Sequence, residues 1–130
     1  MTSAYTATTY IDASPAKVFD YVRVPENQPT WAVNFVRSTR PTTGGRYVME
    51  TPAGAMVYRV EADSKRGTID FIIDGPEGDS ILPARVVSHG RGAIFTFTIT
   101  RTPDMNDQAW ETGMRGMDEE LVNLKRLLES

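Results

Sequence analysis

The chain has 130 residues, of which 40% are hydrophobic and 24% charged, and its formal net charge is -3. This length suits one domain, residues 1–130. The sequence shows no apolar signal segment and no apolar run of membrane-spanning length, which argues against integral membrane association. The net negative charge with scattered lysines and arginines argues against a nucleic-acid surface, and the absence of cysteine favours a reducing, cytoplasmic location.

The N-terminal part predicts a strand followed by two short helical segments. Residues 4–12 are rich in threonine and tyrosine, which is typical of a strand. Ser14-Pro15 then supplies an N-cap and a first helical residue, and Pro25 ends this helix. Residues 25–31 predict one further short turn of helix, which Pro29 interrupts. The apolar face of the first helix is Val18, Phe19 and Val22.

The middle of the chain predicts antiparallel strands. Turn signals rich in glycine, proline and polar residues lie at 51–54, 64–67, 75–78 and 89–92. After residues 31–38, which lead into a second strand, further strands are expected at 45–51, 55–63, 68–74, 80–89 and 93–101. Helices that are segregated in this way from a seven-stranded antiparallel sheet imply an α+β fold.

The C-terminal segment, residues 103–130, predicts one long helix. From Trp110 onward its apolar residues are spaced by steps of four and three, the period of one helix face. Thr102 and Pro103 suit the start of this helix, and Asn106 is a second possible cap. The helix is expected to cover the inner face of the sheet.

The apolar face of this helix changes along its length. Its first half offers tryptophan, methionine and glycine, whereas its second half is leucine, and we expect Leu121 and Leu124 to be buried. Leucine packs tightly, while methionine and tryptophan beside glycine leave an adaptable surface. Two interpretations follow: a core helix with an irregular partner, or a helix that closes the sheet at one end and lines a pocket at the other.

The pairing of strands across the turns predicts which side chains share a face. Residues directly opposite in an antiparallel pair point to the same face, and even-length loops at the three tighter turns set most of the register. Across the longer loop we oppose Asp70 to Arg85, which puts Phe71 beside Ala84. A single bulge would reverse the faces of one strand. The apolar face then comprises Tyr47, Met49, Met56, Tyr58, Val60, Ile69, Phe71, Ile73, Leu82, Ala84, Val86, Phe95, Phe97 and Ile99, and the other face carries Arg46, Arg59, Glu61, Asp70, Arg85 and Thr96.

Two motifs and the order of elements carry a resemblance to a known family. Residues 11–22 read Ile-Asp-Ala-Ser-Pro-Ala-Lys-Val-Phe-Asp-Tyr-Val and precede Trp31, and residues 120–128 read Glu-Leu-x-x-Leu-Lys-x-Leu-Leu. With them, essentially the whole chain resembles the START-like superfamily, also called SRPBCC. This superfamily includes pollen-allergen-type proteins, START lipid-transfer domains and polyketide cyclase/dehydratase-like proteins. The resemblance implies a helix-grip fold, in which a seven-stranded sheet grips the C-terminal helix around a hydrophobic cavity.

The sequence offers little for metal, nucleophilic or phosphate-binding chemistry. The single histidine, His89, lies beside a glycine turn, where we expect an exposed residue. A zinc site needs several clustered ligands, and no nucleophile-elbow pattern surrounds any serine. Gly90-Arg91-Gly92 has the wrong spacing for a dinucleotide fingerprint and precedes a strand. We therefore expect no metal and no cofactor, and catalytic residues are unknown.

One group of charged residues is the best candidate for acid–base chemistry. It comprises Glu61, Asp70 and Arg85, with Arg59 nearby. The predicted register places all four on the face away from the long helix, where they are most simply an exposed charge network. If a bulge reversed those strands, Asp70 and Arg85 would enter the cavity and become catalytic candidates.

The expected function is binding of a hydrophobic small molecule, lipid-like or aromatic, between the sheet and the long helix. Members of the superfamily bind lipids, sterols or aromatic metabolites, cyclise polyketides or bind proteins, so the fold alone assigns no activity. Two alternatives stay open: a polyketide cyclase or dehydratase that shapes a flexible chain, and a protein-interaction module with a filled core. The hydroxyls of Tyr47 and Tyr58 and the indole of Trp110 are polar handles for a ligand. The expected ligand-binding residues are Tyr47, Met49, Tyr58, Phe71, Phe97, Trp110, Met114 and Met117.

The outer face of the predicted sheet is not purely charged. Its apolar residues come from five successive strands, and contiguous apolar patches tend to mark contacts with another protein surface. A two-fold homodimer is the simplest assembly that buries such a patch, although the early helices could instead fold over part of it. The five residues are Val48, Val57, Ile72, Val87 and Ile94.

Overall fold

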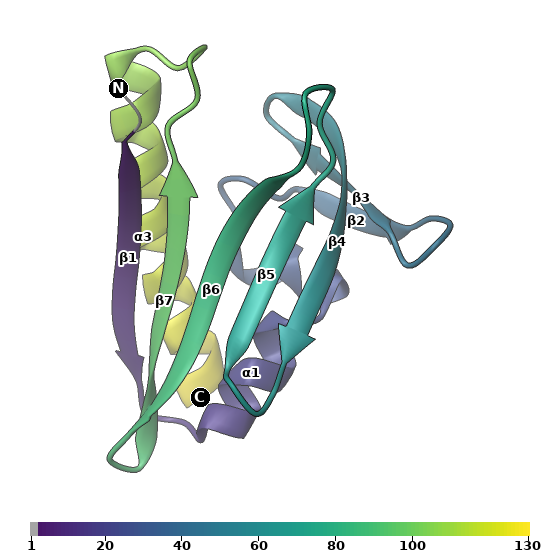
Figure 1. Ribbon diagram of the computed structural model, residues 1–130. Coiled ribbons are helices and arrows are strands. Elements are labelled where there is room, and N and C mark those ends of the chain that lie inside the picture. Colours follow the sequence, from purple (N-terminus) through teal and green to yellow (C-terminus); the bar gives the residue numbers. More distant parts are fainter. Residues whose placement is uncertain (1–2) are drawn as a thin grey trace.

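The protein is built around a seven-stranded sheet (Figure 1). The computed structural model describes residues 3–130, which include this sheet and its helices. The N-terminal elements are β1 (Ala4–Ile11), α1 (Pro15–Val22), the short 3-10 helix η1 (Pro25–Asn27) and α2 (Gln28–Trp31). The strands that follow are β2 (Ser38–Pro41), β3 (Tyr47–Thr51), β4 (Gly54–Asp63), β5 (Thr68–Ile73), β6 (Ser80–His89) and β7 (Gly92–Thr100). The last element is the long helix α3 (Asp107–Glu129).

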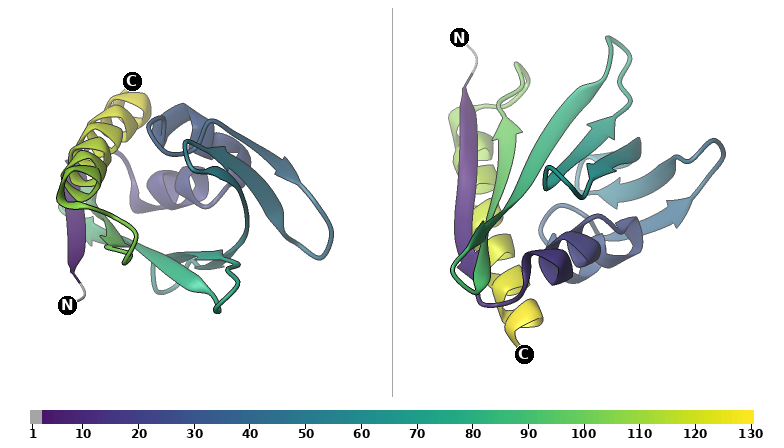
Figure 2. Two further views of the ribbon diagram at one scale, coloured as in Figure 1. Left: turned by 90° about the horizontal axis from the view of Figure 1, so that it is seen from above. Right: turned by 60° about the horizontal axis from the view of Figure 1, so that its bottom comes forward.

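The strands form one antiparallel sheet in the order β1-β7-β6-β5-β4-β3-β2. The sheet bends strongly, so that α3, which packs along β1, and the arm formed by β2 and β3 lie on opposite sides, with α1 and α2 between them (Figure 2). We call the side of the sheet that is turned toward the helices its inner face. This arrangement confirms the predicted α+β helix-grip fold.

The first helix, α1, begins where the sequence predicts. The Ser14 side chain accepts a hydrogen bond from the Lys17 backbone nitrogen at 3.1 Å. Pro15 occupies the start of the helix, where its missing N–H is not needed. The buried side of α1 packs against β6 and β7 and closes one end of the core. Its buried residues are Val18, Phe19 and Val22, as the apolar spacing predicts.

The second helical segment differs from the prediction at Pro29. The chain forms η1 at Pro25 and then α2, and Pro29 lies within the first turn of α2 rather than interrupting it. Proline is tolerated at this point because the first N–H groups of a helix have no intrahelical acceptor. The prediction of an interruption at Pro29 is therefore wrong. The consequence is that Gln28 and Trp31 share one helical turn.

The long helix, α3, starts later than Pro103. Asn106 is its N-cap, and the Asn106 side chain accepts a hydrogen bond from the Ala109 backbone nitrogen at 2.8 Å. Thr102 does not cap the helix, because its hydroxyl instead hydrogen-bonds to the Asp104 carboxylate. The second of the two predicted caps is thus confirmed, and the start at Thr102 and Pro103 is wrong.

The predicted register is confirmed at the tight turns and wrong by two residues across the β5–β6 loop. Tyr47 pairs with Tyr58, as expected, but Asp70 pairs with Pro83 instead of Arg85. The loop needs fewer residues than expected because residues 75–78 form a tight turn, in which Gly78 has a φ of 117° that favours glycine. A shift of two residues preserves the side-chain alternation, so the faces stay as predicted.

Candidate ligand-binding site

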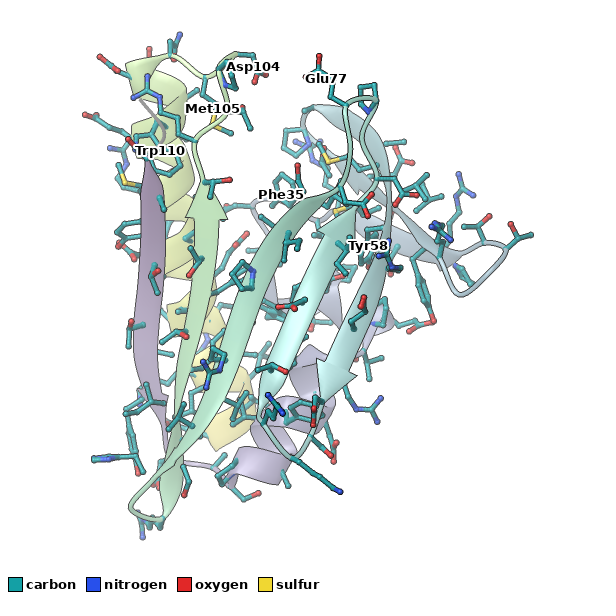
Figure 3. The ribbon with its side chains drawn as sticks, viewed as in Figure 1. Phe35, Tyr58, Glu77, Asp104, Met105 and Trp110 are labelled. Atoms are coloured by element: carbon teal, nitrogen blue, oxygen red, sulfur yellow. The ribbon has the colours of Figure 1, made fainter. Side chains whose placement is uncertain are left out.

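The predicted binding residues divide into two groups. One group belongs to the main core beneath the inner face, where Phe71 and Phe97 have ring centroids 5.7 Å apart. Tyr47 is half-buried and packs against this core, with its ring 6.1 Å from that of Tyr58. Trp110 and Met114 lie outside the core cluster, and Figure 3 shows Trp110 near the start of α3, well away from Tyr58. The buried core members are Met49, Tyr58, Phe71, Phe97 and Met117.

Burial of the inner face decreases toward one end of the grip. Ile73 ends β5, Leu82 lies near the start of β6 and Ile99 lies near the end of β7, so these three residues are close to the loops that carry Glu77 and Asp104 in Figure 3. All three are half-buried although they pack against a fully buried core. We call the half-buried apolar residues of the inner face the rim set. It comprises Tyr5, Tyr47, Met56, Val60, Ile73, Leu82 and Ile99.

A buried polar pair interrupts this apolar interior. The Tyr58 hydroxyl donates a hydrogen bond to Oε1 of Gln28, and both side chains are buried. Burial, with smaller contributions from Glu26 and Tyr47, raises the pKa of the Tyr58 phenol well above its ordinary value. The hydroxyl therefore stays neutral and acts as a donor. Sequence reasoning identified Tyr58 as a polar handle but missed Gln28, which has no periodic signal within its short helix.

Trp31 is the largest completely buried side chain of α2. Its ring packs edge-on against Phe95 and Phe97, with centroid distances of 6.0 and 5.8 Å. Its indole Nε1 is buried and has no hydrogen-bond partner among residues 3–130. The sequence marked Trp31 only as part of a family motif, and its position after a short turn gave no indication of its environment.

A buried carboxyl joins α3 to the loop that follows α2. Glu120 is 2% exposed, and its Oε2 accepts hydrogen bonds from the backbone nitrogens of Asn34 at 2.9 Å and Phe35 at 3.1 Å. Burial raises the pKa of the Glu120 carboxyl to about 7, although these two N–H groups lower it. Sequence reasoning missed this residue. A signal existed, since Glu120 stands three residues after Met117 and four before Leu124, on the apolar side of the helix.

The charged residues of the outer face form a different network from the expected one. Arg59 lies 3.4 Å from Asp79 and 3.8 Å from both Glu61 and Asp74. No ion pair links Asp70 to Arg85 in the described part of the chain. Asp70 lies between the buried Ile69 and Phe71, and Arg85 lies between the buried Ala84 and Val86. Both therefore point to the outer face, and no bulge turns them toward the inner face.

Other features of the described residues bear on the chemical possibilities. His89 is exposed and stacks edge-on with Tyr10. Between residues 3 and 130, no three histidine or acidic side chains are grouped so that they could hold a metal ion. Over the same residues, no helix has both the length and the apolar character needed to cross a membrane.

A cleft of about 430 Å³ lies outside the predicted site. It is bounded by α1, the β4–β5 turn and β6, so it is at the α1 end of the sheet and not beside α3. Its lining combines apolar side chains such as Phe19 and Val86 with the cations Lys65, Arg66 and Arg85. Gly67 fixes the turn against β6, because a side chain there would collide with the Val86 carbonyl.

The bent sheet, the gripping helix and the apolar inner face together define a START/polyketide cyclase-like protein. More specifically, the family model described as polyketide cyclase / dehydrase and lipid transport matches residues 3–129, and the chain belongs to this family. No curated protein matches the chain.

Solved structures share the fold at low sequence identity. XoxI from Bacillus cereus is 15% identical with a TM-score of 0.75, over 97% of this chain and 95% of XoxI. The Aha1 dimer from Colwellia psychrerythraea is 16% identical with a TM-score of 0.75, over 98% of this chain and 96% of Aha1. KanY is 18% identical with a TM-score of 0.76, over 100% of this chain and 99% of KanY. At these identities the likeness extends to the fold alone.

Proposed function

We propose that the protein binds a hydrophobic small molecule, lipid-like or aromatic, between the inner face of the sheet and α3. The observation that carries this proposal is the rim set, a group of apolar side chains that remain half-buried although the core behind them is fully buried. Ligand sites are mostly apolar, with a few placed polar groups. The rim set supplies the apolar surface, and the Tyr58–Gln28 pair supplies the polar groups.

Native mass spectrometry of freshly purified protein is the first test, because it detects retained small molecules. A matched pair of variants then locates the site. Leu82→Gln changes the rim set, whereas Ile81→Gln changes the adjacent residue, which points to the outer face and is exposed. We expect Leu82→Gln to weaken binding of an apolar fluorescent probe about tenfold and Ile81→Gln to leave it unchanged. Equal binding by both variants, or no binding by the wild type, would contradict the proposal.

A polyketide cyclase or dehydratase is a second candidate, supported by Glu120. A buried carboxyl with a pKa of about 7 can give or take a proton near neutral pH. In such an enzyme Glu120→Gln would abolish turnover of a polyketide-like substrate without weakening its binding. Retained turnover in this variant would exclude Glu120 as the proton-transfer group.

We also propose that the protein forms a homodimer through the outer face of the sheet. Val57 and Val87 are 36% and 44% exposed and belong to strands on either side of β5. Val48 and Ile72, which were expected in the same patch, are 9% and 5% exposed and are therefore covered within their own chain. Val57 is level with Asp74 and Val87 is level with Arg66 across β5, so the proposed contact extends along the length of the outer face and includes one valine near each end.

A further inference from the structure

The short helix α2 presents two polar side chains to the interior of the protein. Gln28 and Trp31 are three residues apart, a spacing that places them on one face of a helix. They are 3% and 0% exposed. The Gln28 side chain reaches β4 through Tyr58, and the Trp31 ring reaches β7 through Phe95 and Phe97. This face of α2 therefore lies against the core on which the rim set packs.

Trp31 carries a donor that no described residue satisfies. The indole Nε1–H can only donate a hydrogen bond, and in this protein it is buried without an acceptor among residues 3–130. Buried polar groups in folded proteins nearly always have a partner, from the protein, from water or from a ligand. The two edge-on aromatic contacts fix the ring, so the direction of the N–H is fixed as well.

Gln28 holds the neighbouring polar position on the same turn of α2. Its Oε1 accepts the hydrogen bond from the Tyr58 hydroxyl, and this sets the orientation of the amide. The same turn of α2 thus offers one buried donor, the Trp31 Nε1–H, that requires an acceptor atom from outside the described chain.

We propose that α2 recognises a neutral carbonyl oxygen on the bound molecule, with Trp31 Nε1–H as the donor. This inference rests on the proposed ligand-binding function and specifies the class of ligand: an apolar ketone, ester or amide. A free carboxylate is disfavoured, because a buried charge needs a partner and no arginine or lysine is buried in the described chain. The buried Glu120 also adds negative charge when it is ionised.

Three naphthalene probes of similar size test this preference. The ketone 2-acetylnaphthalene carries the acceptor, 2-ethylnaphthalene lacks it, and 2-naphthoate replaces it with a carboxylate. We expect the wild type to bind the ketone about tenfold more tightly than the hydrocarbon, the effect of one net hydrogen bond, and to bind the carboxylate more weakly than the ketone. Trp31→Phe should remove most of the ketone preference and leave the affinity for the hydrocarbon nearly unchanged.

The matched control is Tyr21→Phe. The Tyr21 hydroxyl shares a hydrogen bond of 2.6 Å with Thr30, so this variant removes a polar contact to the same helix without removing a buried donor. It should keep the tenfold ketone preference. Loss of the preference in both variants would show that the position of α2, and not the indole donor, sets it, and this result would overturn the inference.

A measurement on the wild type covers the case in which Trp31→Phe does not fold. The chain has two tryptophans, so two indole N–H signals are expected in a nitrogen–proton correlation spectrum, and Trp110→Phe assigns them. The Trp31 signal should move downfield with the ketone and not with the hydrocarbon. An unchanged Trp31 signal on saturation with the ketone would overturn the inference.

The failure of this inference can be told from the failure of the proposed function. Equal affinity for the ketone and the hydrocarbon rejects carbonyl recognition and leaves hydrophobic binding in place. Binding of the carboxylate as tightly as the ketone rejects the preference for a neutral ligand. If no probe binds and no small molecule is retained in the native mass spectrum, both the proposed function and this inference are rejected.

Discussion

Oε2 of Glu120 lies 2.9 Å from the backbone nitrogen of Asn34 and accepts its hydrogen bond. A second bond, from the Phe35 nitrogen at 3.1 Å, reaches the same oxygen. Together these bonds fasten the loop after α2 to the middle of α3, and they bridge 86 residues of sequence. The Glu120 carboxyl that makes this contact is only 2% exposed, so its protonation state affects the stability of the fold.

The first prediction is that Glu120 makes the protein less stable as the pH rises from 4.5 to 7. The carboxyl has a pKa of about 7 in the folded protein and an ordinary value of 4.5, because burial opposes its ionisation. Over this interval the unfolded chain releases the proton before the folded protein does, so the free energy of unfolding falls. The loss from this group is roughly 3 kcal/mol and is complete above pH 7.

Urea unfolding of wild type and Glu120→Gln at pH 5 and pH 8 measures this effect. Glutamine can still accept the two backbone hydrogen bonds and does not ionise. The variant should therefore not show the decrease in the free energy of unfolding that ionisation of Glu120 causes between pH 5 and pH 8. Glu111→Gln is the control, because Glu111 is exposed on the same helix. If wild type and Glu120→Gln lose equal stability between the two pH values, Glu120 does not titrate as described.

The second prediction concerns the leucine half of α3. Leu121 and Leu124 are buried in the main core, and replacing either with alanine should lower the free energy of unfolding by about 2–5 kcal/mol, through lost burial and a residual cavity. Val122→Ala is the matched control, since Val122 lies between them and is exposed, and it should change stability by less than about 1 kcal/mol. Denaturant melts measure all three variants. Losses below about 1 kcal/mol for both leucine variants would contradict the described packing.

Much of the fold is predictable because its signals are local. Side-chain alternation and turn residues identify the strands of the sheet, and the four- and three-residue steps identify α3. The β5–β6 register was missed for a physical reason: a shift of two residues keeps every side chain on the same face, so hydrophobicity alone cannot detect it. The start of α3 was ambiguous because Thr102 and Asn106 are both residue types that cap helices.

The candidate site is less predictable because its polar residues depend on distant partners. Tyr58 and Phe71 could be assigned to the inner face from alternation alone. Gln28 becomes a buried polar residue only because Tyr58, 30 residues away, reaches it. Glu120 is buried by a loop 86 residues away. The spacing from Met117 and Leu124 could have placed Glu120 on the buried side of α3, but nothing in the local sequence identifies the partners of Gln28 and Glu120, which only the tertiary structure shows.

The third prediction is that Arg85 is dispensable for stability and for ligand binding. Arg85 is exposed on the outer face and forms no ion pair within the described residues, so Arg85→Ala should change the free energy of unfolding by at most about 1 kcal/mol. The variant should also bind the apolar probe as tightly as the wild type. Arg59→Ala is a useful comparison, because Arg59 contacts three carboxylates. Loss of binding or of turnover in Arg85→Ala, with the fold intact, would favour an enzyme that uses this residue.

The fourth prediction is a homodimer that buries Val57 and Val87. Burying these exposed valines removes apolar surface from water, and a two-fold axis lets the outer face pair with its own copy. Light scattering at micromolar concentration should give the mass of a dimer. Val57→Glu and Val87→Glu should each shift the mass toward the monomer, since each places two like charges in the contact, whereas Val122→Glu on the exposed side of α3 should not. A monomer mass for the wild type would reject the dimer. A dimer that persists in both variants would reject this surface and place the contact elsewhere on the protein.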